Sequence, residues 1–142
     1  MLYLRDFNDL LNKIKFSDME IKSLVSLKNR IEDRALSINS NISEKVAGNK
    51  QLDKTCDLIV NYVDLDSEIK VKITELERDK CRAFKAIQQL SNPLERIVLV
   101  ERHLNIKSWK EIAVDLLKSE RQLLNIYKSA MSNMNTEYIS MC

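Results

Sequence analysis

The sequence has one glycine, Gly48, and one proline, Pro93. Sheets and loop-rich folds need more of both residues, because glycine allows positive φ angles and proline presets the geometry of turns. Aromatic residues are also scarce, at 6%. Apolar residues (44%) instead recur regularly among charged ones (31%) along nearly the whole chain, which argues against disorder. The composition therefore predicts an all-α protein.

Cysteine and histidine are equally scarce. Cys56, Cys81 and Cys142 are an odd number at wide spacing, and His103 is the only histidine. Since no CxxC pair or Cys/His cluster is present, we expect no zinc site, no cofactor, and reduced thiols in a cytoplasmic protein. A lone histidine beside Arg102 is more typical of a packing or surface position than of a catalytic base.

Motifs of common enzymes are missing as well. The sequence has no glycine-rich phosphate loop, no H-E-x-x-H zinc motif and no nucleophile elbow, so we expect no enzymatic activity. No apolar run approaches the ~18 residues of a membrane span, and the first residues do not form a signal peptide, so no membrane contact is expected. The net charge of +2 permits a nucleic-acid partner without requiring one.

Long helices are predicted for residues 1–91. The apolar residues from Leu4 to Ile14 form one helical stripe, and Ser17-Asp18-Met19-Glu20 matches a capping box. We therefore expect a first helix to end near Lys15 and a second to begin at Asp18, with a single bent helix as the alternative. Residues 43–52 hold the only glycine and no clear stripe, which predicts a connecting loop.

A third helix is expected from about residue 52 to about residue 90. It is too long to bury its apolar stripe alone, so we expect a coiled-coil-like antiparallel hairpin with the second helix, or pairing with another subunit. Lys28 and Asp66 are polar positions of this seam and would fix its register. The apolar face is expected to consist of Leu52, Cys56, Ile59, Val63, Ile69, Ile73, Leu76, Ala83, Ile87 and Leu90.

The segment Ser91-Asn92-Pro93 predicts the end of the long helix and the start of a new one. Proline is excluded from a helix interior but suits its first turn, with Asn92 or Ser91 as the cap. We place the domain boundary here. Residues 1–91 would form the helical hairpin, for oligomerisation or partner binding, and residues 92–142 a DNA-binding helix-turn-helix domain.

Residues 106–134 carry two helix-start signals. Ser108 with Glu111 forms a capping box, and Ser119 caps a further helix after a turn at Lys118. Two short helices joined by a tight turn are the outline of a helix-turn-helix. Helical spacing predicts that the two helices share one small core, made of Trp109, Ile112, Ala113, Leu116, Leu123, Ile126, Tyr127 and Ala130.

The other face of the last helix would meet duplex DNA. Arg121, Gln122 and Asn125 are of types that contact base edges in a major groove, whereas lysines contact phosphates. Leu124 would meet a thymine methyl or a partner protein. A solvated helix face is the alternative interpretation of these side chains. The predicted DNA-binding residues are Lys110, Lys118, Ser119, Arg121, Gln122, Leu124, Asn125 and Lys128.

Residues 94–131, LERIVLVERHLNIKSWKEIAVDLLKSERQLLNIYKSAM, resemble the helix-turn-helix of bacterial sigma-factor region four. The matching features are W-x-x-I-A-x-x-L, the serine cap and the pattern of the following helix. The whole chain resembles small phage and prophage proteins of Gram-positive bacteria, which include late-gene transcriptional regulators of the ArpU and RinA type. The resemblance implies a DNA-binding transcriptional regulator that acts as a dimer on duplex DNA in the bacterial cytoplasm.

Two departures from this family matter physically. The family usually has glycine in the turn where this chain has Leu117, and leucine at a positive φ angle costs about 1 kcal/mol. Either the turn is adjusted or it carries that strain. Residues 94–142 hold seven Lys/Arg against six Asp/Glu, a small excess for a phosphate binder. A coiled-coil interaction protein that binds RNA polymerase, or a DNA-packaging recognition subunit that forms rings, is therefore the alternative function.

Overall fold

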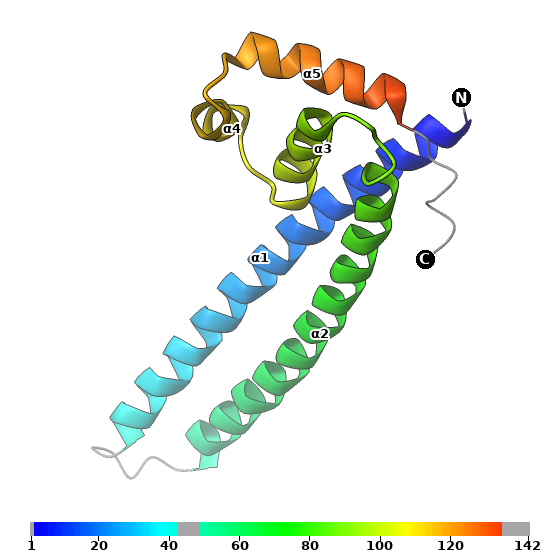
Figure 1. The fold of residues 1–142 in the computed structure, drawn as a ribbon. Helices are drawn as coiled ribbons and strands as arrows, with labels where there is room; N and C mark the ends of the chain where they lie inside the picture. Colours follow the sequence, from blue (N-terminus) through cyan, green and yellow to red (C-terminus); the bar gives the residue numbers. More distant parts are fainter. Residues whose placement is uncertain (1, 43–48, 135–142) are drawn as a thin grey trace. The chain divides into compact units, whose positions relative to one another are not determined.

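The computed structural model describes residues 2–42 and 49–134, with side chains described for residues 6–37, 57 and 59–134. Every element in these ranges is helical, which confirms the all-α expectation for this part of the chain (Figure 1). The elements are α1 (Leu2–Ile42), α2 (Asn49–Ile87), α3 (Pro93–Leu99), the π-helix η1 (Val100–Leu104), α4 (Trp109–Leu116) and α5 (Glu120–Asn133). Of the expected loop, residues 43–48 lie outside the described residues, and α2 already begins at Asn49.

Helix α1 is continuous, so the predicted break between Lys15 and Asp18 is wrong. The apolar stripe runs through the capping-box motif without interruption, from Phe7 and Ile14 to Ile21, all of them buried. A capping box satisfies amides that lack a partner in a preceding turn. Inside α1 the preceding turn supplies those partners, so the Ser17 motif is not used as a helix start.

The chain divides by its contacts into two units that differ from the predicted domains. One unit holds residues 1–17 and 76–142, and the other holds residues 18–75. The start of α1 and the end of α2 thus belong with the C-terminal helices. Both segments contain fully buried residues, such as Phe7 and Ile87. That residues 92–142 form a domain of their own stays a prediction.

Charged pairs join α1 to α2 within the unit of residues 18–75. Lys28 Nζ lies 2.6 Å from Asp66 Oδ1, and Lys72 Nζ lies 2.6 Å from Glu20 Oε1. Residue numbers rise along α1 as they fall along α2, so the paired segments run antiparallel. The hydrogen bond between Lys28 and Asp66 raises the pKa of the lysine and lowers the pKa of the aspartate. The two polar positions predicted to fix register are therefore bonded to each other.

The predicted apolar face of α2 is partly wrong. Ile59, Val63 and Ile73 are exposed, whereas Leu65 and Ile69 are buried, as are the expected residues from Leu76 to Leu90. The side chains of Leu52 and Cys56 lie outside the described residues. At about 100° per residue, Val63 lies about 160° around the helix from Leu65, on its opposite side. The described part of the chain therefore leaves apolar side chains of α2 uncovered. None of its helices is both long and apolar enough to cross a membrane.

Candidate nucleic-acid interface

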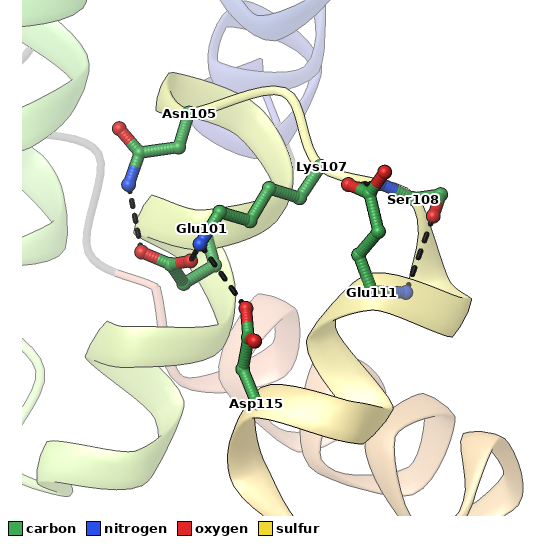
Figure 2. A network of polar contacts seen from close by, with 6 residues as sticks. All are labelled: Glu101, Asn105, Lys107, Ser108, Glu111 and Asp115. Atoms are coloured by element: carbon green, nitrogen blue, oxygen red, sulfur yellow. Dashed lines mark hydrogen bonds and ion pairs between the residues drawn. The ribbon is translucent and has the colours of Figure 1, made fainter.

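Two reciprocal capping boxes start α4 and α5; the sequence predicts the box at Ser108 and the cap at Ser119. Ser108 Oγ accepts a hydrogen bond from the Glu111 amide at 3.2 Å, and the Glu111 carboxylate accepts from the Ser108 amide at 3.3 Å (Figure 2). Ser119 Oγ and the Gln122 amide form the same arrangement at 3.1 Å, with Gln122 Oε1 accepting from the Ser119 amide at 3.0 Å. Each box satisfies two backbone amides that have no partner within the helix.

The turn between the two helices carries backbone strain at Leu117. This residue ends α4 in the left-handed conformation, at φ 54° and ψ 44°. The conformation lets the Lys118 amide donate to the Ala113 carbonyl at 3.1 Å, which closes the helix. Of the two outcomes expected for Leu117, the turn is therefore strained rather than adjusted, at a cost of about 1 kcal/mol. The Leu117 side chain is 91% exposed, so its packing does not offset that cost.

A small apolar core holds α3, α4 and α5 together. Val98, Ile112 and Leu123 are fully buried at its centre, and the partly buried residues around them are Trp109, Ala113, Leu116, Ile126 and Tyr127. All of the α4 and α5 members were predicted from helical spacing. The Trp109 and Tyr127 rings meet edge to face, with centroids 5.2 Å apart, a favourable aromatic geometry. This core fixes which side of α5 points outward.

The outward side of α5 carries most of the predicted DNA-binding residues. Arg121, Asn125 and Lys128 are exposed, and Leu124 is 43% exposed. At about 100° per residue, these four side chains fall within about 100° of each other around the helix and face away from Leu123. They therefore form a continuous strip, called here the α5 face.

The other four predicted residues are placed differently. Ser119 and Gln122 are exposed but form the capping box of α5, so their side chains already have a structural role. Lys110 belongs to α4 and is exposed, and Lys118 lies in the turn and is half-buried. The structure thus places Lys110 and Lys118 on the elements that precede the α5 face, not on it.

Two acidic residues near the interface, Glu101 and Asp115, are paired with Lys107. Lys107 Nζ bonds Glu101 Oε2 at 2.5 Å and Asp115 Oδ2 at 3.1 Å, and Figure 2 shows the lysine between the two carboxylates. These hydrogen bonds raise the pKa of Lys107. Within the described residues, no carboxylate forms an ion pair with Lys110, Lys118, Arg121 or Lys128.

Two polar side chains of this unit, those of Glu95 and His103, have partners that the sequence did not indicate. Glu95 of α3 is only 5% exposed, and its carboxylate accepts hydrogen bonds from Ser129 Oγ at 2.7 Å and Asn133 Nδ2 at 3.2 Å, which link α3 to α5. His103 Nε2 lies 2.9 Å from the Tyr127 hydroxyl. Burial, with the charges of Arg102 and Lys15, lowers the pKa of His103 from 6.5 to about 4. Its side chain is thus an uncharged packing residue at neutral pH.

No group of acidic, histidine or cysteine side chains in the described part of the chain is arranged to hold a metal ion. Comparisons with models of protein families, with curated proteins and with solved structures gave no match to this chain.

Proposed function

We propose that this protein binds duplex DNA through α4 and α5, which act as a helix-turn-helix with α5 as the reading helix. The observation that carries the proposal is the α5 face: Arg121, Asn125, Lys128 and Leu124 project together from a helix whose opposite side is held by a core. A helix enters the major groove, where arginine pairs with guanine, asparagine with adenine, and an apolar side chain with a thymine methyl.

The local charge distribution supports the same proposal. Phosphate contacts supply most of the affinity of DNA-binding proteins, and they need cations that are not already neutralised. Among the described residues, no ion pair neutralises Lys110, Lys118, Arg121 or Lys128, whereas Lys107 neutralises Asp115. Once Asp115 is neutralised by Lys107, residues 109–133 carry four cations against Glu111 and Glu120, a net charge of +2.

We further propose that the protein regulates transcription as a homodimer, with α1 and α2 forming an antiparallel helical hairpin that pairs with a second copy. Exposed apolar side chains on both helices support this, among them Leu36 of α1 and Ile59, Val60 and Val63 of α2. A two-fold dimer would present two α5 helices to two half-sites of an operator, which would compensate for weak binding by each copy.

The test of DNA reading uses selection from a pool of random duplexes at two salt concentrations. We expect an enriched sequence motif, and a slope of log affinity against log salt of about −2.7 for three phosphate contacts per copy, by Lys110, Lys118 and Lys128. The double variant Arg121→Ala/Asn125→Ala should lose the specific complex while keeping its helix content. Lys22→Ala, a change at an exposed lysine of α1, is the control.

Retention of the specific complex by Arg121→Ala/Asn125→Ala would show that α5 is not the reading helix. Binding to RNA polymerase that is insensitive to salt, together with no measurable DNA affinity, would instead favour the interaction-protein function.

A further inference from the structure

A small cavity lies in the unit of residues 1–17 and 76–142, away from the α5 face. Its volume is about 210 Å³, and its lining comes from α1 and from the segment after α3: Leu11, Asn12, Lys15, Arg102, His103 and Ile106. Pockets for drug-sized ligands usually measure about 300–1,000 Å³, so this one suits a smaller molecule or a single functional group.

The backbone around the cavity is unusual at two places. Residues Val100–Leu104 form a π-helix, in which the Asn105 amide donates to the Val100 carbonyl at 2.9 Å. Two residues later in the chain, Ile106 has a φ of 55°, a left-handed conformation that is unfavourable for a β-branched side chain. π-Helical turns and strained residues both concentrate at functional sites. Here the two features together place Arg102, His103 and Ile106 in the wall of one cavity.

The polar groups that line the cavity are two cations and two neutral side chains. Lys15 and Arg102 supply two positive charges, Asn12 supplies an amide, and no carboxylate is among the lining residues. Within the described residues neither Lys15 nor Arg102 forms an ion pair. Arg102 is held in place by donation from its Nη1 to the Lys107 carbonyl at 2.9 Å and by stacking over the Trp109 ring at 4.8 Å.

We propose that this cavity binds the phosphate group of a small ligand or of a nucleic-acid backbone. A fixed guanidinium matches the geometry of phosphate oxygens, and a flexible lysine adds a point charge beside it. Positive charge concentrated in a partly enclosed site raises the local concentration of anions. Lys15 and Arg102 disfavour the protonated form of His103 through their positive charges. An anion bound between them would offset these charges.

The single histidine makes this proposal directly measurable. The imidazole proton signals of His103 are followed by NMR in the full chain, while sodium phosphate replaces sodium chloride at constant ionic strength. We expect a saturable change in chemical shift, with a dissociation constant of about 1 mM or tighter, and a rise in the pKa of His103. Three charged or titratable groups contact or face this ring, namely Lys15 of α1, Arg102 of η1 and Tyr127 of α5.

Two variants separate site binding from a general salt effect. Lys15→Gln removes one charge from the cavity at an exposed position, and we expect phosphate to bind at least about tenfold more weakly. Lys22→Gln removes the same charge further along α1 and should bind phosphate as the unaltered chain does. A response that does not saturate, or that is equal in Lys15→Gln and in the unaltered chain, overturns the proposal.

A third arm identifies the source of the phosphate group. Adenosine monophosphate and a short DNA duplex are each titrated against the same His103 signal, with and without saturating inorganic phosphate. Displacement of the monophosphate alone identifies a small ligand, and displacement of the duplex identifies a backbone phosphate. Binding of neither, alongside saturable binding of inorganic phosphate, supports the free ion as the ligand.

Discussion

The acid stability of the protein should depend on His103. Its pKa is lowered from 6.5 to about 4 by burial and by the charges of Arg102 and Lys15. Above pH 7 the ring is neutral in both the folded and the unfolded chain, so its titration does not lower the free energy of unfolding. As the pH falls below 6.5, His103 becomes protonated in the unfolded chain but stays neutral in the folded chain. The free energy of unfolding therefore decreases until the pH reaches about 4, where the folded chain is protonated as well.

The size of this effect follows from the two pKa values. Between pH 7.5 and pH 5.0 the difference in proton uptake corresponds to a loss of about 2 kcal/mol in the free energy of unfolding. This is a large fraction of the stability of a small domain. The substitution His103→Gln removes the titration, although it also removes the contact with Tyr127 and lowers stability at every pH.

The assay is urea unfolding followed by the fluorescence of Trp109, the only tryptophan in the chain. The unaltered chain should lose about 2 kcal/mol more than His103→Gln between pH 7.5 and pH 5.0. Carboxylates that titrate in this range contribute equally to both proteins, so the comparison isolates the histidine. Equal losses in the two proteins would refute the reasoning, because His103 would then titrate alike in the folded and unfolded chains.

Two further predictions concern Leu117 and the apolar surface of α2. Leu117→Gly should raise the free energy of unfolding by about 0.5–1 kcal/mol, since glycine relieves the left-handed strain but adds flexibility to the unfolded chain. In thermal melts the control Leu117→Ala, which keeps its Cβ atom, should not gain this stability. Equal gains in the two variants would contradict the strain argument. The double variant Ile59→Glu/Val63→Glu should be a monomer in light scattering, because each substitution places a carboxylate at an exposed apolar position of the proposed dimer. The control variant Asp57→Ala should keep the mass of the unaltered chain. An unchanged mass of the double variant would exclude this surface from the interface.

Local motifs predicted the C-terminal helices well. Ser108 and Ser119 each start a helix where the sequence places one, and Asn92 caps α3 through its side chain, which accepts from the Leu94 amide at 2.9 Å. Capping involves residues only two or three positions apart, so the sequence contains all of the required information. Helical spacing likewise predicted the inward side of α5, and with it the residues that remain for the α5 face.

Contacts between distant parts of the chain were not predictable in the same way. The Ser17 motif has the pattern of a cap, but burial of a stripe from Phe7 to Ile21 keeps the helix continuous through it. Glu95 looks like an ordinary surface acid until its partners Ser129 and Asn133 are brought to it from α5. The environment of His103 was not predictable from its neighbours in sequence, because it includes Lys15, 88 positions earlier, and Tyr127.

The sharing of one contact unit by residues 2–17 and 76–134 has a consequence for biosynthesis. Residues 2–17 leave the ribosome well before residues 76–134, with which they share this unit. At about 5–20 residues per second, the intervening stretch takes several seconds to make. During that time this amphipathic segment exposes its apolar stripe, so a nascent chain stalled before residue 76 should be a better substrate for chaperones than one released after residue 134.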